Sequence, residues 1–335
     1  MKSQFVIVIA MITLIFGCQS AGEKTKTAEK NISPIDSLSA LIENGNKDAN
    51  LFYQRGKLYF QKGKLDSAIS DLELAVRIDS TKPEYYTDLS QYYLLTAHSE
   101  KTRDILKRAE DKFPDNIPVL MDAGKLYLYV SDYEKAKGYF NRILELDNYN
   151  GMAYFYKGII AKEENHPKSL RKFMQKTIQY LPNFYDGYFT LGLSYVEDTD
   201  SLAIQYLNTA IRLKPKSEEA YYAKGMFFQN AGKPFQAVRQ YEFILDSLDS
   251  NNIDAHYNIG YLLLTETNKY KAAEPYFEKV YQLDSTRLDA LYNLGLAKEM
   301  QKDFSSSRKF YAEVLKKNPT FNLAIQGMNR LDKKH

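Results

Sequence analysis

The chain has 335 residues, with 45 lysines and arginines against 42 aspartates and glutamates and a formal net charge of +3 at pH 7. Because the two signs nearly balance, the chain lacks the strong positive charge typical of proteins that bind nucleic acids, and we expect no such partner. Its single cysteine, Cys18, excludes an intramolecular disulfide.

The first 17 residues predict a secretion signal. Lys2 precedes an almost unbroken apolar run over residues 5–16, which is too short to span a bilayer as a helix but suits the hydrophobic segment of a signal peptide. An aliphatic, a variable and a small residue then precede the cysteine, which resembles the lipobox of bacterial lipoproteins: Ile15, Phe16, Gly17 and Cys18. The alternative is an uncleaved signal anchor with a chance cysteine.

This resemblance implies cleavage after residue 17 and attachment of acyl chains such as palmitate to Cys18. Two or more acyl chains anchor a protein stably to a membrane. Residues 18–32 are polar, so we expect a lipidated flexible tether. Gln19 is not the aspartate that retains many lipoproteins at the inner membrane, so the family's sorting rule favours the outer membrane and leaves its periplasmic or surface face open.

A small residue then recurs at intervals of 33 to 35 residues. The positions are Gly56, Ser90, Gly124, Gly158, Gly192, Gly225, Gly260 and Gly295. Around the first of them, Phe52 and Tyr59 lie on the same helical stripe, and Gly63 marks a turn. Ala68 and Leu72 continue a second stripe. The repeat therefore predicts a helical hairpin copied in tandem.

This pattern resembles the tetratricopeptide repeat, whose second helix often ends near a proline, as at Pro114, Pro182, Pro215 and Pro319. The resemblance covers residues 49–320 and implies an all-α, right-handed superhelical solenoid of eight hairpins. Terminal hairpins have only one neighbour and need caps. We expect a capping helix in residues 33–48, and a capping helix with a short tail in residues 321–335. One-residue slips in three copies predict either a bend or harmless variation in the connections.

An aromatic row in the first helices is the strongest candidate for a binding site. Three residues before the small residue stand Tyr53, Phe155, Phe189, Tyr222, Tyr257 and Tyr292. In the repeat family the first helices line a concave groove, so the resemblance implies that these rings contact a peptide or protein. Packing against neighbouring hairpins explains them equally well.

Two further features of the first helices point to a partner. Asn258 and Asn293 occupy a position where asparagine in this family often bonds the backbone of a bound peptide. Six residues before the glycine, the last four copies carry Asp186, Glu219, Asp254 and Asp289. These acids would select a basic partner, although the helix dipole alone favours acids in a first turn.

The sequence offers no catalytic constellation. The four histidines do not share metal-ligand spacing, and phosphate-binding glycine loops and nucleophile motifs are missing. We therefore expect no enzymatic activity, no metal and no cofactor. The expected function is a membrane-anchored scaffold or adaptor that binds proteins or peptides during envelope assembly or recruitment. The alternative is a glycan- or nutrient-binding lipoprotein of an outer-membrane uptake system, against which the even repeat spacing and the lack of tryptophan argue.

Overall fold

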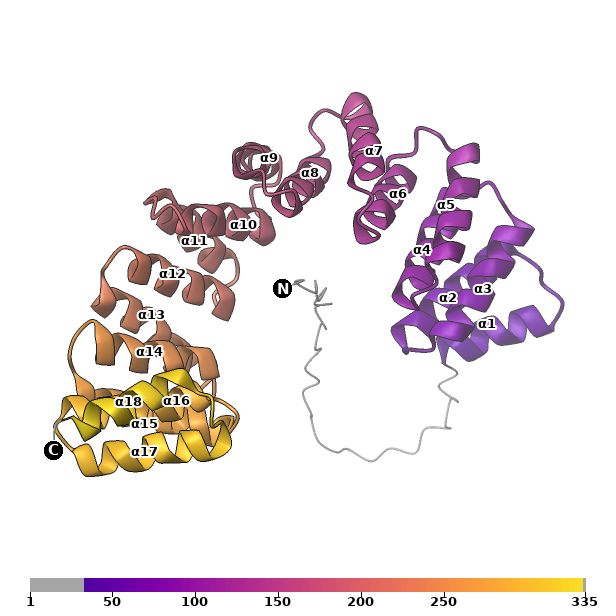
Figure 1. Cartoon of the computed structure of the whole chain (residues 1–335). Coiled ribbons are helices and arrows are strands. Elements are labelled where there is room, and N and C mark those ends of the chain that lie inside the picture. Colours follow the sequence, from indigo (N-terminus) through magenta and orange to yellow (C-terminus); the bar gives the residue numbers. More distant parts are fainter. Residues whose placement is uncertain (1–32, 334–335) are drawn as a thin grey trace, which may run out of the picture. The chain divides into compact units, whose positions relative to one another are not determined.

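The computed structural model describes residues 33–333, and all the regular structure in that range is α-helical (Figure 1). Within the same range, no helix combines the length and apolar character needed to cross a membrane. The predicted signal peptide, the tether and Cys18 lie outside the described residues. The chain divides into two compact units, with the boundary between Ile78 and Asp79.

The first unit is a capped hairpin, in which α1 packs on α2 and α2 packs on α3. Arg55 of α2 donates to Asp71 of α3 at 2.8 and 2.7 Å and to Ser39 of α1 at 3.1 Å. One guanidinium therefore links all three helices through charge-assisted hydrogen bonds. The helices are α1 (Pro34–Glu43), α2 (Ala49–Gln61) and α3 (Leu65–Ile78).

The second unit contains seven further hairpins and a last helix. The first helices of these hairpins are α4 (Pro83–Leu95), α6 (Ile117–Tyr129), α8 (Gly151–Glu163), α10 (Tyr185–Val196), α12 (Glu218–Asn230), α14 (Ile253–Thr265) and α16 (Leu288–Met300). Their second helices are α5 (Ser99–Lys112), α7 (Tyr133–Leu146), α9 (Pro167–Tyr180), α11 (Leu202–Leu213), α13 (Pro234–Ser247), α15 (Tyr270–Leu283) and α17 (Phe304–Lys317), and α18 (Asn322–Asp332) follows. This succession of hairpins between two single helices confirms the predicted all-α repeat fold.

Local sequence fixes where the first helices begin. Asn116, Asn150, Ser217 and Asn252 precede α6, α8, α12 and α14, and each side chain accepts a hydrogen bond from the backbone N–H three residues later, at 2.9 to 3.1 Å. Such caps satisfy backbone donors that have no partner inside the helix.

Each hairpin turn contains one residue in the left-handed region: Gly63, Ala97, Ser131, Asn165, Thr199, Gly232, Asn268 and Lys302. Around the last of them, the N–H of Lys302 donates to the Glu299 carbonyl at 3.0 Å, and that of Asp303 to the Lys298 carbonyl at 2.9 Å. These two bonds form the helix-ending motif that permits a sharp reversal of the chain.

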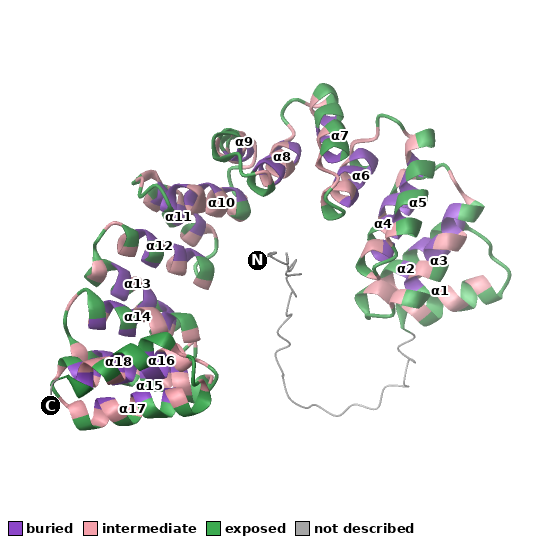
Figure 2. Ribbon diagram, viewed as in Figure 1, coloured by how far each residue is buried: buried purple, intermediate pink, exposed green. Residues whose placement is uncertain are grey.

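The recurring glycines let the two helices of a hairpin approach closely. A Cβ built on Gly225 would lie only 2.5 Å from Cε1 of Tyr241, a ring that is fully buried. The slips in repeat length leave this pairing intact, because Gly192 still faces Leu207 and Gly260 still faces Phe277. Figure 2 shows the buried residues on the helix faces that meet one another and the exposed residues on the outer faces and turns.

Candidate binding surface on the first helices

The aromatic row lies on the first helices, as the repeat register predicts. In the second unit it consists of Phe155, Phe189, Tyr222, Tyr257 and Tyr292 on α8, α10, α12, α14 and α16. The first four are half-buried and Tyr292 is 8% exposed. Tyr53, on α2 of the first unit, is equally buried and has the ammonium of Lys57 5.2 Å from its ring centre.

In the second unit, each ring of this row packs against another ring. Phe189 stacks on Tyr185 with centroids 5.6 Å apart, and Tyr292 stacks on Tyr311 at 5.5 Å. Tyr257 contacts Phe277 edge-on at 5.8 Å. The rings therefore contribute to packing, and the half-buried ones also keep surface for a partner. Their role in binding stays a prediction.

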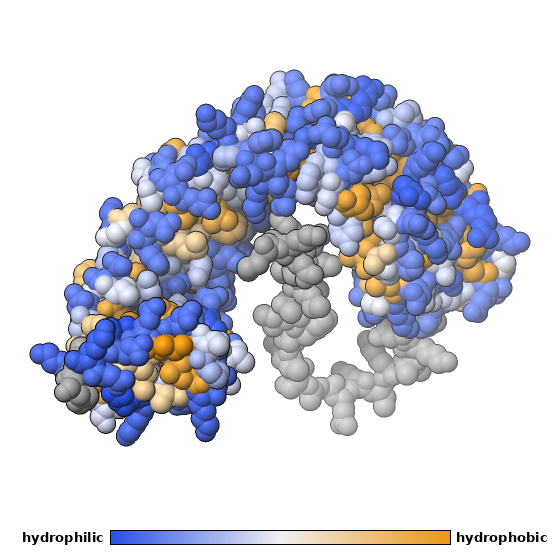
Figure 3. Space-filling model, viewed as in Figure 1, coloured by the Kyte–Doolittle hydropathy of each residue, from blue (hydrophilic) through white to orange (hydrophobic). Residues whose placement is uncertain are grey.

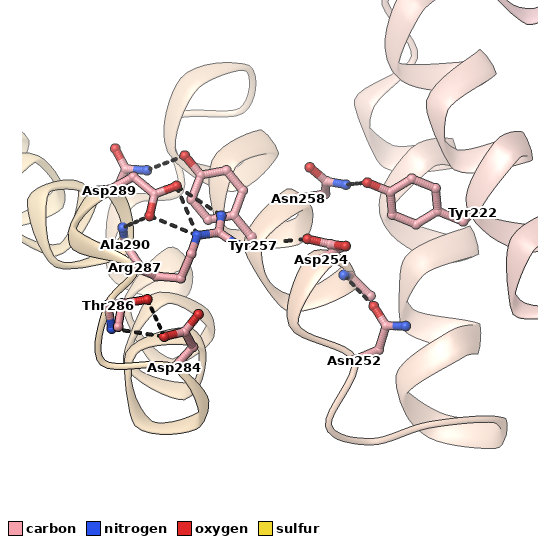
Figure 4. A network of polar contacts seen from close by, with 12 residues as sticks. Tyr222, Asn252, Asp254, Tyr257, Asn258, Asp284, Thr286, Arg287, Asp289 and Ala290 are labelled. Atoms are coloured by element: carbon pink, nitrogen blue, oxygen red, sulfur yellow. Dashed lines mark hydrogen bonds and ion pairs between the residues drawn. The ribbon is translucent and has the colours of Figure 1, made fainter. Parts of the chain in front are cut away.

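The two asparagines connect consecutive hairpins, and Figure 4 shows the first of them, Asn258, beside Tyr222. Asn258 donates from Nδ2 to the hydroxyl of Tyr222 at 2.8 Å, and Asn293 donates in the same way to Tyr257 at 3.3 Å. Each bond joins one first helix to the next, and Asn293 is only 6% exposed. The contact of these amides with a bound peptide stays a prediction. Each Nδ2 already donates a hydrogen bond to a tyrosine hydroxyl within the chain.

The sequence contains a signal for this pairing that the repeat register alone does not reveal. In the second unit, where the row has Tyr222 and Tyr257, the next copy supplies an asparagine two residues before its glycine, whereas Tyr53 of the first unit is followed by Asp88. Where the row has Phe155 or Phe189, the next copy has a threonine or an alanine at that position. A hydroxyl and an amide thus occur together, as expected for hydrogen-bonded neighbours.

Arg287 extends the same network across Tyr257. Its guanidinium carbon lies 4.7 Å from the centre of the Tyr257 ring, its Nε and Nη2 contact the carboxylate of Asp289 at 3.0 and 2.9 Å, and its Nη1 is 3.7 Å from Asp254 (Figure 4). The hydrogen bonds to Asp289 raise the pKa of Arg287. Burial raises the pKa of Tyr222 and of Tyr257 above the usual value. The arginine stays charged and the tyrosines stay neutral hydrogen-bonding groups at neutral pH.

A second apolar row runs beside the aromatic row, one residue after each glycine. It consists of Ile159, Leu193, Met226, Tyr261 and Leu296, four residues after the aromatic residue of the same helix. Met226 is 37% exposed, Tyr261 is 38% exposed, and the other three are half-buried. Residues four apart share a helix face, so we call the two rows together the first-helix stripe. In Figure 3, hydrophobic surface gathers over α10 to α12 and near α16, and also near α4 and α6, with hydrophilic surface between.

The sequence indicates only part of this second row. One residue after the glycine, early copies have Lys57 and Lys125 and later copies have uncharged residues. The exposure that makes an apolar side chain a possible contact depends on the fold. In residues 33–333, no three histidine, cysteine, aspartate or glutamate side chains gather as a metal site.

Comparisons with known proteins address the repeats directly. A family model described as "Tetratricopeptide repeat" matches residues 49–82, 117–150 and 253–287, and a second model with the same description matches residues 289–320. The matched segments correspond to the first, third, seventh and eighth hairpins. Tetratricopeptide repeats generally mediate protein–protein interactions.

Distant relatives match part of the chain in sequence. The chain is 21% identical over 210 residues to a TPR repeat-containing protein of Methanocaldococcus jannaschii, and 23% identical over 188 residues to anaphase-promoting complex subunit 3 of Schizosaccharomyces pombe. These alignments cover 60% and 56% of the chain, but only 33% and 26% of the relatives' own lengths.

Among solved structures, the C-terminal part of a TPR repeat-containing protein from Cytophaga hutchinsonii matches with a TM-score of 0.63 at 16% identity, over 72% of this chain and 98% of that one. A tetratricopeptide repeat protein from Parabacteroides merdae matches with a TM-score of 0.52 at 16% identity, over 75% and 99%. At such identities the likeness concerns the fold alone. The chain therefore contains tetratricopeptide repeats, and its hairpins have the fold of that family.

Proposed function

We propose that this chain is a non-catalytic scaffold that binds other proteins or peptides through the first-helix stripe. The observation that carries the proposal is the continuity of the stripe. Each of five successive first helices has an aromatic residue and, one turn later on the same face, a second apolar or aromatic residue. Partly exposed aromatic and apolar side chains supply most of the binding energy at protein interfaces.

The substitution pair Met226→Asp/Tyr261→Asp tests this proposal. Both residues lie on the exposed edge of the stripe, so charges there oppose apolar docking while the buried core of each hairpin stays intact. We expect chemical crosslinking and co-purification from the native envelope to recover markedly less of specific partner proteins with this variant than with the wild type.

The matched control places the same charges on exposed aromatic residues outside the stripe. Phe235, on the second helix α13, is 57% exposed, and Tyr149, in the turn before α8, is 67% exposed. Phe235→Asp/Tyr149→Asp should recover partners as the wild type does. Equal loss in both variants, or no loss in either, would contradict binding through the stripe.

We further propose that the scaffold is anchored through lipid on Cys18 to a bacterial outer membrane, where it serves envelope assembly or recruitment. The support is the lipobox resemblance at residues 15–18 and the polar residues that follow. Cys18→Ala should move the protein from the membrane fraction to the soluble fraction, and metabolic labelling with a palmitate analogue should fail on the variant. Continued membrane residence of unlabelled Cys18→Ala would contradict lipid anchoring.

A further inference from the structure

We infer that the first-helix stripe binds a basic, apolar peptide segment of its partner, with a lysine or arginine side chain over the Tyr222 ring between Glu219 and Asp254. This inference rests on the proposed function, because it gives the chemistry of the partner that the same stripe would hold.

Arg287 shows how this surface holds a cation. It lies over the ring of Tyr257, is paired with Asp289 of the next first helix and lies 3.7 Å from Asp254 of the same helix as the ring. The tyrosine ring and the two acids attract the cation together, because the face of the ring is electron-rich and the acids are negatively charged.

The same combination recurs one hairpin earlier with no lysine or arginine of the described chain over the ring, and its two acids form long ion pairs, Glu219 with Lys214 at 4.0 Å and Asp254 with Arg287 at 3.7 Å. Tyr222 takes the place of Tyr257, with Glu219 on its own helix and Asp254 on the next. The residue that corresponds to Arg287 is Asn252, whose side chain caps α14 and donates to Glu218 at 3.1 Å. Among residues 33–333, no lysine or arginine lies over the Tyr222 ring.

The charge balance of this edge of the stripe also favours a basic partner. Of its four acids, Asp289 and Asp254 share Arg287, and Glu219 reaches Lys214 at 4.0 Å. Asp186 forms no ion pair within the part of the chain that the structure describes, and burial raises its pKa. Four acids thus face two cations.

Two glutamates add negative charge at the opposite end of the stripe. Glu163 at the end of α8 and Glu197 just after α10 are exposed. The helix dipole explains an acid in a first turn, but it does not explain acids at both ends of the helices or the ring contact that Arg287 makes. A partner with basic groups flanking apolar ones complements this arrangement, since the long stems of lysine and arginine cover apolar surface while their charged ends reach the acids.

Two synthetic peptides of about three heptads serve as probes. In both, two positions of each heptad are leucine; the remaining positions are lysine in one peptide and glutamate in the other. We expect fluorescence anisotropy at low salt to show that the wild-type protein binds the leucine–lysine peptide and not the leucine–glutamate peptide. Glu219→Gln/Asp254→Asn should weaken that binding about fivefold, the size of effect that a few partly exposed charges produce.

The control variant is Asp246→Asn/Glu278→Gln, which removes two exposed acids from the second helices α13 and α15. It should bind the leucine–lysine peptide as the wild type does. A third variant, Asn252→Arg, introduces the chain's own cation at the position that corresponds to Arg287, and it should weaken peptide binding by competition. Circular dichroism of each variant establishes that the helices are retained.

The outcomes separate this inference from the proposed function. Equal affinity for both peptides, or an unchanged affinity of Glu219→Gln/Asp254→Asn for the leucine–lysine peptide, overturns the inference that the partner is basic. If Met226→Asp/Tyr261→Asp nevertheless abolishes binding of the peptides, the stripe remains the binding surface. If Met226→Asp/Tyr261→Asp leaves binding of every probe and of native partners unchanged, the proposed function itself fails.

Discussion

Single residues decide how closely the two helices of a hairpin approach. Gly225 on α12 faces the ring of Tyr241 on α13, which has no exposed surface and cannot move without disturbing its neighbours. Gly138 also lies inside a helix, α7, but a Cβ built there meets nothing within 4 Å. Close packing thus requires glycine at position 225, whereas no neighbouring atom requires it at position 138.

These two glycines make a matched pair of substitutions. Gly225→Ala should lower the free energy of unfolding by about 2 kcal/mol, because its Cβ would overlap a buried ring. Gly138→Ala should raise it by about 0.5–1 kcal/mol, because alanine loses less backbone entropy in a helix. Urea unfolding followed by circular dichroism measures both, and a stabilising Gly225→Ala would show that the hairpin core is looser than its contacts indicate.

At the scale of elements, the last helix is held by a polar cluster around a buried carboxylate. Arg330 of α18 contacts both carboxylate oxygens of Glu299 on α16, at 3.1 and 2.8 Å, and Tyr311 of α17 donates to the same carboxylate at 2.9 Å. The Glu299 side chain is 1% exposed. The hydrogen bonds to Glu299 raise the pKa of Arg330, so the charge of the arginine is always present to compensate the buried carboxylate.

Arg330→Gln should detach this capping helix before the rest of the second unit unfolds. Removing one partner leaves a buried carboxylate undercompensated, which costs about 2 kcal/mol. Hydrogen exchange should then show faster exchange of the α18 amides, while α4 to α7 keep their protection. Arg308→Gln is the control: its ion pair with Asp332 also reaches α18, but that acid is 60% exposed where Glu299 is 1% exposed, so we expect a change below about 1 kcal/mol. Equal effects of the two variants would mean that the polar cluster does not hold α18.

The elements themselves could be predicted because their signals are local. Small residues at a fixed interval, apolar stripes and turn residues all act within one hairpin, so they identify each helix and its partner. Arg330 with Glu299 could not be predicted, because the pair joins residues 31 positions apart through a side-chain geometry that periodicity does not encode. The turn residue Lys302 adopts φ of +64° although lysine carries no preference for that region, which shows the fold overriding local propensity.

Across the whole molecule, the sequence predicts which helices carry the candidate site but not the contacts that its side chains make. The repeat register places Phe155, Phe189 and Tyr222 on successive first helices, as observed. It does not reveal that Asn258 bonds Tyr222 or that Arg287 covers Tyr257, because these contacts cross between hairpins. Such contacts between neighbours are what make an array of repeats cooperative.

Tyrosine burial throughout the array predicts loss of stability at alkaline pH. Burial raises the pKa of Tyr92 and of Tyr185 to about 12, whereas an unfolded tyrosine has a pKa of about 10. Above pH 10 the unfolded chain therefore releases protons that the folded chain still binds, and the free energy of unfolding falls as pH rises. The stabilising contribution is complete below about pH 10 and is lost as pH approaches 12.

Tyr185→Phe measures the share of one residue in this effect. At pH 7 the variant loses the hydrogen bond between the Tyr185 hydroxyl and Ser217 Oγ, 2.6 Å apart, and so we expect it to be less stable by about 1 kcal/mol. Between pH 10 and 12 it should lose about 1–2 kcal/mol less stability than the wild type, because one buried ionisable hydroxyl is gone. Tyr149→Phe, at an exposed ring, should follow the wild-type curve throughout. If the curves of Tyr185→Phe and the wild type run parallel from pH 10 to 12, burial of this hydroxyl does not couple its ionisation to folding, and the alkaline loss of stability arises elsewhere in the array.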